Sequence, residues 1–409
     1  MRQILIISTI LVLSIAVILA AAPPKLTSVP EVTGTMSLSK STFVDANQIL
    51  MFVTNYGVFG QDVGQVFLDW PDGEYGVGTW WPFNGDTTSI RNNIDNADDH
   101  SLQYGAGLWM GGIVDGEPRV TLTKSTSWRG EYVPGPMFAG SFLPDDPSFK
   151  VYKLYSDSLE SNPNDDYLNW PVSQGAPVDQ AGHPAMLGDR LLWSVFNDAD
   201  LSRHDIDGGG CHPLGVEVQQ TVWAYESTDI DTSNVVFIRY KLYNKGDNAI
   251  NDFYISLYAD MDLGDYDDDM VGCDTLTNLF YTFNSGNGDV NYGSPPPAAG
   301  YKILKGPVVP DADSTAYFDG HLLSGFRNLP MTGFIGRGVA YFPSDSLQAY
   351  NFMRGLDTDT LSQSVPLESG TTYEYPGDPV AGTGFVYPEN EAGDLYTLGS
   401  CGPMQFYPG

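Results

Sequence analysis

Cysteine is scarce in this chain, since only Cys211, Cys273 and Cys401 occur among its 409 residues. An oxidising compartment therefore permits one disulfide at most, for which Cys211–Cys273 is conceivable, and a disulfide scaffold is excluded. Basic residues are also few, 19 against 51 acidic ones, so the formal net charge is −32. A surface this negative repels phosphate backbones and anionic lipid and attracts cations, which argues against nucleic acid as a partner.

Recognisable catalytic motifs are missing as well. The sequence contains no Gly-x-Ser-x-Gly elbow, no His-Glu-x-x-His pair and no phosphate-cradling glycine loop. Paired carboxylates for glycoside hydrolysis have no diagnostic value, because 51 acidic residues make such pairs inevitable. We therefore predict no catalytic residue and no organic cofactor.

Long apolar runs are confined to the N-terminus. Residues 1–22 combine Arg2, an apolar stretch and a closing alanine triplet, the pattern of a Sec signal peptide. The apolar run is nearly long enough to be an uncleaved anchor instead. We expect cleavage between Ala20 and Lys25, a secreted or outer-surface protein, and no membrane span after signal removal.

The remaining pattern is that of β-strands. Apolar residues alternate with period two over 216–225, 236–243 and 253–259, which predicts an antiparallel meander with one buried face. Shorter strand signals cover 49–54, 66–70, 107–114 and 118–122. The one convincing helix begins at Ser344 or Asp345 and ends at Gly355. The sequence thus predicts an all-β, β-sandwich-like fold of antiparallel sheets with long acidic loops and one short helix.

Four segments follow from composition. They are the signal peptide (1–22), an N-terminal β domain (23–155), a polar junction (156–184) and a β-sandwich-like domain with the acidic loops (185–409). We expect the last domain to be incomplete and the chain to continue beyond Gly409, because no closing element follows the final strand-and-turn passage.

Aspartates are concentrated directly after the strand that ends at Ala259. Because so many carboxylates in one loop repel one another, a cation is expected to neutralise them. Ca²⁺ suits such a loop, since it takes six to eight oxygen ligands in irregular geometry, and Gly264 and Gly272 would let the backbone fold round it. The alternative is a solvated acidic loop. The candidate ligands are Asp260, Asp262, Asp265, Asp267, Asp268, Asp269 and Asp274.

A second acidic cluster follows the apolar segment 191–196. It shares the first site or forms another, and it consists of Asn197, Asp198, Asp200, Asp205 and Asp207. His204, Cys211 and His212 invite a zinc site, but their spacing matches no compact zinc motif, so solvated imidazoles are the preferred interpretation.

Aromatic residues suggest one further alternative. Trp80, Trp81 and Phe83 could form a sugar-stacking platform, although aromatic residues beside Pro and Gly more often pack against their own sheet.

Several segments, spread over roughly residues 105 to 405, carry a resemblance to a known family. They include GLWMGG at 107–112, GDRLLWSVFNDAD at 188–200 and MRGL at 353–356. These pieces resemble a family of large secreted proteins exported by the type IX secretion system of Gram-negative bacteria. The resemblance implies a modular, β-rich extracellular protein with a C-terminal sorting domain, which we expect to follow Gly409. The family has no established catalytic residues that could be assigned to positions in this sequence.

These observations favour a calcium-stabilised, non-enzymatic protein with a structural, adhesive or binding role. Its expected partner is an extracellular polysaccharide or a cell-surface protein. The alternative is a carbohydrate-active enzyme or sugar-binding module that uses the acidic loops and Trp80/Trp81.

Overall fold

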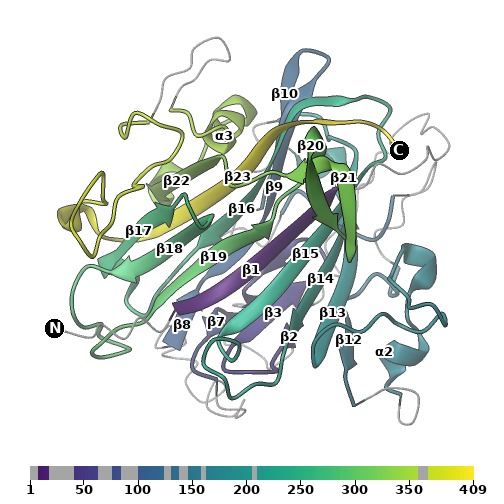
Figure 1. Cartoon of the computed structure of the whole chain (residues 1–409), viewed down its shortest axis with the longest axis horizontal. Coiled ribbons are helices and arrows are strands. Elements are labelled where there is room, and N and C mark those ends of the chain that lie inside the picture. Colours follow the sequence, from purple (N-terminus) through teal and green to yellow (C-terminus); the bar gives the residue numbers. More distant parts are fainter. Residues whose placement is uncertain are drawn as a thin grey trace.

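The computed structural model describes residues 8–17, 41–62, 76–83, 100–123, 130–137, 146–157, 163–204, 210–357 and 367–409. Within these ranges two large, mainly antiparallel sheets face each other across a hydrophobic core (Figure 1). The all-β, sandwich-like fold predicted from the period-two alternation is therefore confirmed.

Sheet A contains nine strands in the described part of the chain. In spatial order they are β11 (Val133–Pro134), β13 (Arg190–Asn197), β14 (Val216–Ala224), β15 (Val235–Asn244), β1 (Ser8–Val17), β19 (Ala298–Lys305), β18 (Leu279–Asn284) and β17 (Asp269–Asp274), with β12 (Tyr152–Tyr155) also paired to β13.

Sheet B contains ten strands within the described ranges. Their order is β22 (Gly333–Gly338), β23 (Leu395–Phe406), β16 (Ile250–Asp260), β9 (Gly105–Val114), β4 (Val58–Phe59), β3 (Leu50–Thr54), β7 (Thr79–Trp80) and β8 (Ser101–Gln103). Two further strands pair at the side, β10 (Glu117–Thr121) with β9 and β2 (Ser41–Val44) with β3.

Two small ribbons, two α-helices and five short 3₁₀ helices complete the described regular structure. The ribbons are β20 (Val308–Phe318) with β21 (His321–Asn328), and β5 (Gln61–Asp62) with β6 (Gly76–Val77). The α-helices are α2 (Asp165–Leu168) and α3 (Ser346–Met353). Helix α3 is the predicted one, and Asp345 caps it by accepting a hydrogen bond from the Gln348 N–H at 2.8 Å. None of the described helices is long and apolar enough to cross a membrane.

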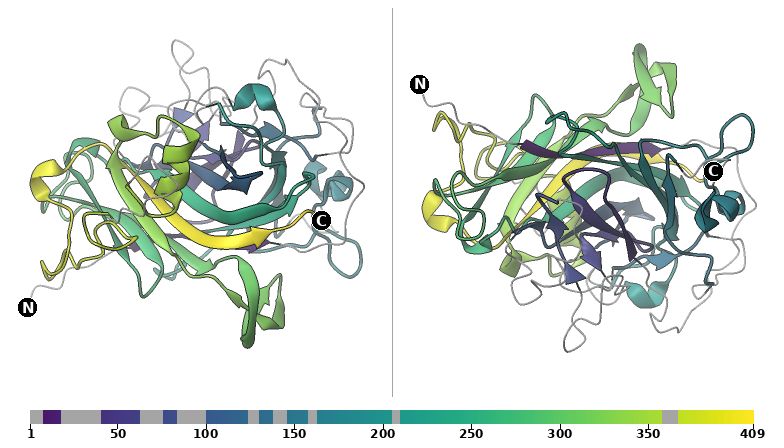
Figure 2. Two further views of the ribbon diagram at one scale, coloured as in Figure 1. Left: turned by 90° about the horizontal axis from the view of Figure 1, so that it is seen from above. Right: turned by 90° about the horizontal axis from the view of Figure 1, so that it is seen from below.

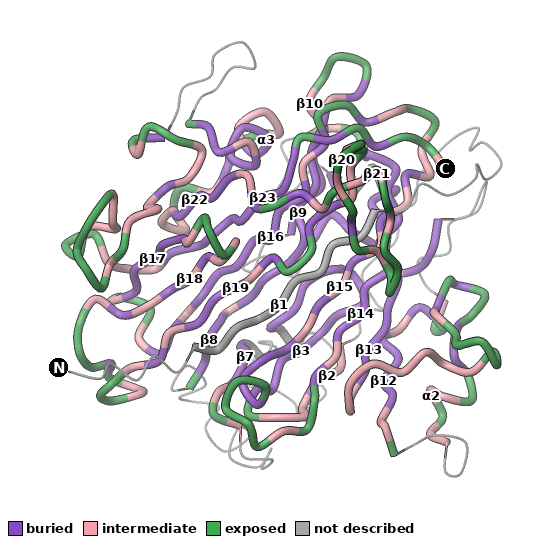
Figure 3. Tube along the Cα trace, viewed as in Figure 1, coloured by how far each residue is buried: buried purple, intermediate pink, exposed green. Residues whose placement is uncertain are grey.

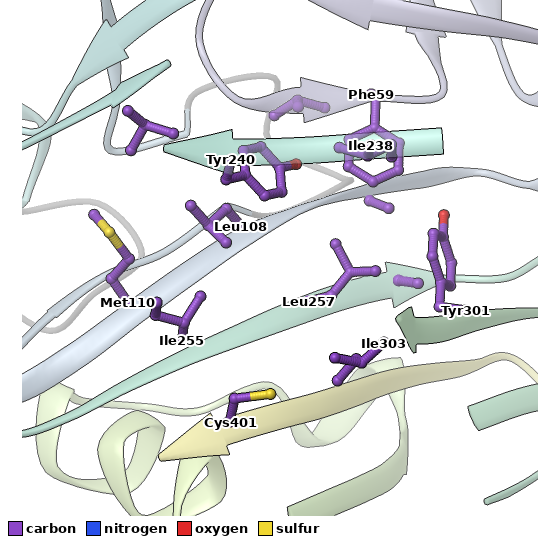
Figure 4. Packing of buried hydrophobic residues seen from close by; sticks show 14 of the residues in the cluster. Phe59, Leu108, Met110, Ile238, Tyr240, Ile255, Leu257, Tyr301, Ile303 and Cys401 are labelled. Atoms are coloured by element: carbon purple, nitrogen blue, oxygen red, sulfur yellow. The ribbon is translucent and has the colours of Figure 1, made fainter. Parts of the chain in front are cut away.

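The core lies between the two sheets and is filled by alternate residues of their strands. Ile238 and Tyr240 of β15 project toward Leu108 of β9, and Ile255 and Leu257 of β16 lie in the same layer (Figure 4). All five side chains are fully buried. Burying an aliphatic side chain of this size contributes about 1.5–3 kcal/mol, so alternation along the strands largely decides the fold. Figure 3 shows the burial running along the central strands of both sheets.

One part of the predicted meander is wrong. β14 and β15 pair antiparallel as expected, but β16 leaves them and enters sheet B between β9 and β23. Both faces of β16 are largely buried, because the core lies on one side while Tyr254 and Tyr258 pack with α3 and β23 aromatics on the other. Pairing of β9 with β16 also places strands of the two predicted domains, 23–155 and 185–409, in one sheet.

The N-terminal apolar segment forms β1 in the structure, where it lies between β15 and β19. The strand predicted over 66–70 lies outside the described residues. The three cysteines are free thiols, so the conceivable Cys211–Cys273 disulfide is not formed.

Candidate metal centre

Three carboxylates meet at one end of the sandwich. One side-chain oxygen each from Asp260, Asp262 and Asp394 lies within 4.8 Å of the others. Asp260 ends β16, Asp262 lies two residues further along, and Asp394 directly precedes β23, the neighbour of β16 in sheet B. The antiparallel pairing of β16 with β23 places the end of one strand beside the start of the other, which brings these residues together.

A fourth carboxylate borders this group from sheet A. Asp269 begins β17, and its backbone carbonyl accepts a hydrogen bond from the Gly393 N–H at 3.0 Å. Its side-chain Oδ2 accepts a second from the Leu263 N–H, also at 3.0 Å. Asp269 is thereby fastened to the residues that follow Asp262 and to the residue that precedes Asp394.

The Asp269 side chain is fully buried, yet its second oxygen, Oδ1, has no hydrogen-bond partner in the described structure. Burial raises the pKa of this carboxyl well above its usual range, and the nearby charges of Asp262, Asp268 and Asp289 act in the same direction, against the Leu263 N–H. A buried carboxylate oxygen without a donor is costly, so this position favours either a proton or a cation.

Burial also raises the pKa of Asp394, and the charge of Asp267 raises it further. The same cause, reinforced by Asp289 and Asp265 and opposed by Asn284, raises the pKa of Asp268. The described end of the sandwich is therefore a region in which negative charge is disfavoured unless it is compensated.

Asp289 holds the acidic loop in place through hydrogen bonds. Its oxygens accept hydrogen bonds from the backbone N–H groups of Asp265, Asn291 and Tyr292 and from the Asn284 side-chain amide. Gly264 lies against this carboxylate with φ of 76°, and a Cβ there would come within 2.5 Å of Asp289 Oδ1. Glycine is therefore required for this turn.

The other acidic residues predicted as ligands in this loop have local structural roles. Asp265 caps a short 3₁₀ turn by accepting the Asp267 N–H at 3.2 Å, and Asp268 accepts the Asn284 amide at 2.5 Å. Asp274 binds the Leu276 N–H and the Thr277 N–H and hydroxyl in the turn after β17. Asp267 is exposed. Of the seven predicted ligands in this loop, the structure therefore groups Asp260 and Asp262, with Asp269 adjacent.

The second predicted cluster does not join the first. Its described members hydrogen-bond to neighbouring backbone and side-chain groups of the fold. Asp198 accepts four hydrogen bonds at 2.7–3.0 Å, from the Thr121 hydroxyl and the N–H groups of Leu214, Gly215 and Val216. Asn197 binds Gly135 and Ala199, while Asp200 caps the turn at Ser202. Asp205 and Asp207 lie outside the described residues.

The predicted environment of the zinc candidates is partly wrong. His204 is fully buried rather than solvated: Nε2 lies 2.9 Å from the Asp198 carbonyl and Nδ1 lies 3.8 Å from Glu131. Burial raises the pKa of Cys211 to about 11, so its thiol stays protonated against the Val120 backbone. His212 is exposed. In the described residues these groups do not converge on one metal position.

The aromatic residues proposed as a sugar platform pack against the protein. Trp80 is 6% exposed and lies with Leu50 and Phe52, with Phe83 against the same cluster. Trp81 donates its indole N–H to Asn234 at 2.7 Å. These contacts agree with the expectation that aromatic residues beside Pro and Gly pack against their own sheet.

Comparisons with protein families, with curated proteins and with solved structures found no match to this chain. The site is therefore interpreted from its own geometry. Asp394 is the functional candidate that sequence reasoning missed, because nothing in its spacing connects it with a loop more than a hundred residues earlier.

Proposed function

We propose that this chain is an exported, non-enzymatic β-sandwich protein that binds Ca²⁺ at Asp260, Asp262 and Asp394 and serves a structural or adhesive role outside the cell. The observation that carries the proposal is the convergence of these three carboxylates within 4.8 Å beside the buried Asp269. Removal of residues 1–22 on export is part of the proposal and is supported by their composition.

The spacing of the oxygens suits calcium. Two ligands that each lie about 2.4 Å from one ion are at most about 4.8 Å apart, and the three oxygens lie within that limit of one another. Every candidate donor is a carboxylate, a ligand type that Ca²⁺ prefers and that zinc sites rarely use alone. Carbonyl groups and water would complete the coordination.

The site lies where the two sheets meet, so a bound ion would stabilise their packing. Asp260 ends β16 and Asp394 directly precedes β23, both strands of sheet B, whereas Asp269 begins a strand of sheet A. Two unit charges about 5 Å apart repel by roughly 3 kcal/mol at an effective dielectric constant of about 20, so the ion-free site opposes close approach of the sheets. A bound cation would convert this repulsion into a clamp between β16, β17 and β23.

Thermal unfolding tests the proposal. After chelation, millimolar Ca²⁺ is expected to raise the melting temperature by a few degrees, since an ion present at a hundred times its Kd stabilises the folded state by about 2.7 kcal/mol. Mg²⁺ should act less because it demands tighter octahedral geometry. The double variant Asp260→Asn/Asp262→Asn should lose most of the shift. An equal response of wild type and double variant would refute this site.

A further inference from the structure

Strand β1 occupies an unusual place in sheet A. It pairs in parallel with β15 over residues 10–17 and with β19 over residues 8–14, whereas the other described strand pairs of this sheet are antiparallel. β15 and β19 therefore run in the same direction with one strand between them. Since neighbouring strands are about 4.8 Å apart, β15 and β19 are separated by roughly 10 Å.

The two flanking strands are fastened separately to sheet B, so the space between them does not close easily. On one side, the Asn244 side-chain amide at the end of β15 donates to the Phe406 carbonyl of β23 at 2.9 Å. On the other side, the Tyr301 hydroxyl of β19 donates to the Gln103 side chain of β8, and its ring packs edge-on against Phe59 of β4. Closing the space would require these buried contacts to shift together.

A hairpin bridges the outside of the same space. β20 and β21 follow β19 along the chain, and Figure 2 shows this hairpin standing out from the sandwich, with β20 in contact with β1. At their turn, Asp319 lies 2.6 Å from Lys241 Nζ and 3.2 Å from an Arg239 guanidinium nitrogen, both on the outer face of β15. The hairpin thus links β19, which it follows along the chain, to β15 on the other side of β1.

We infer that sheet A contains an acceptor groove for one extended, apolar strand, and that in the exported protein a separate polypeptide fills it. The inference rests on the proposed function in one respect, the removal of residues 1–22 on export. That removal would take β1 away and leave the backbone N–H and C=O groups of β15 and β19 without their partners. Buried backbone groups in this state are costly, and an added strand satisfies them.

The sequence of β1 defines the chemistry of the partner. Its ten residues, STILVLSIAV, include no charged residue, no proline and no glycine. The groove is therefore suited to an uncharged segment of about eight to ten residues, rich in β-branched and aliphatic side chains, running parallel to β15. Main-chain hydrogen bonds on both sides would give affinity, and the buried side of the sandwich would select apolar residues.

The test uses exported protein and a synthetic probe. Mass spectrometry of the recovered chain first establishes its N-terminus. The probe is a fluorescent peptide with the sequence of residues 8–17 and two added lysines at each end for solubility. It is expected to bind the processed chain with one-to-one stoichiometry, to raise its melting temperature, and to bind at least about tenfold more weakly when Leu11→Pro and Leu13→Pro remove two strand donors.

A hairpin variant adds a control on location. Asp319→Asn keeps the positive-φ turn but removes the charge that holds Lys241 and Arg239, so peptide dissociation should accelerate on the order of fivefold. Asp313→Asn, on the same hairpin but without a described ion pair to β15, should leave dissociation unchanged.

Each outcome decides the inference. Specific peptide binding supports it, and processed chains that self-associate until the peptide disperses them also support it and identify a second copy as the partner. A processed, folded chain that ignores the peptide overturns the groove and leaves the calcium proposal standing. A recovered chain that keeps residues 8–17 overturns it too, and separately shows that signal removal fails.

Discussion

Gly393 donates its backbone N–H to the carbonyl of Asp269 at 3.0 Å, and this contact ties the segment before β23 to the start of β17. Through it, the residue next to Asp394 is held against the acidic loop that follows β16. Three chain segments from two sheets therefore meet where negative charge is concentrated. A cation at this junction would stabilise the packing of the sandwich and not merely the loop.

The acidic loop should divide into ligands and non-ligands. Asp262→Asn is expected to weaken Ca²⁺ binding on the order of tenfold, because it deletes one charge from the converging group. Asp267→Asn and Asp274→Asn are matched controls, since Asp267 is exposed in the same loop and Asp274, at the end of β17, binds its own turn. Calcium titrations of the three variants measure this. Equal losses in all three would indicate diffuse charge attraction.

The calcium response should depend on pH. Burial raises the pKa of Asp269 and Asp394 above their ordinary value of 3.8, so without the ion the folded state holds more protons than the unfolded state. Stability without Ca²⁺ should then fall as pH rises from about 4 through the raised values, because charging these groups disfavours the fold. Calcium needs the charged forms. Its stabilising effect should therefore be near zero at about pH 4 and grow toward pH 7 in melting curves with and without chelator.

Glu374 should give an independent pH dependence. Burial raises its pKa to about 7 from an ordinary 4.5, although Arg337 and the Gly336 N–H lower it. The folded state therefore binds the extra proton between these values, and stability falls as pH rises from about 4.5 to about 7, by up to roughly 3 kcal/mol. Glu374→Gln should flatten this part of the profile in chelator. A variant with an unchanged profile would assign the slope to other groups.

The Asp198 cluster should matter for stability and not for calcium. Asp198→Ala leaves four buried donors without their acceptor and is expected to cost about 3–5 kcal/mol in denaturant unfolding. Asp200→Ala, which removes the cap at Ser202 and the ion pair with Arg203, should cost less, about 1–2 kcal/mol. Both variants should keep the calcium shift. Its loss in Asp198→Ala alone would make this cluster the ion site.

Local patterns predicted much of the fold. The alternation of β15 and the cap and stop signals of α3 are properties of neighbouring residues, and the structure confirms both. The place of β16 could not be predicted in this way, because alternation shows that one face is buried but does not show which sheet buries it. A strand with two buried faces needs partners that lie far away in the sequence, here β9 and β23.

The same limit applies to the candidate site. Charge density in the sequence identified Asp260, Asp262 and the adjacent Asp269, but also four neighbours that the structure uses in turns or leaves exposed. Asp394 entered the group only through the pairing of β16 with β23. Asp289, which supports the loop, was likewise missed because its four donors come from backbone and amide groups brought together by folding.

The central claim is that Ca²⁺ binds at Asp260, Asp262 and Asp394. Calorimetric titration with Ca²⁺ of protein that a chelator has freed of metal, comparing wild type with Asp394→Asn, tests it most directly. Asp394 comes from a distant segment, so its effect reports the folded site and not the acidity of one loop. The account predicts one strong site per chain in wild type and binding weakened on the order of tenfold in Asp394→Asn, with Asp378→Asn, an exposed turn residue, behaving as wild type. Undetectable binding to wild type, or identical binding by all three proteins, would contradict the account.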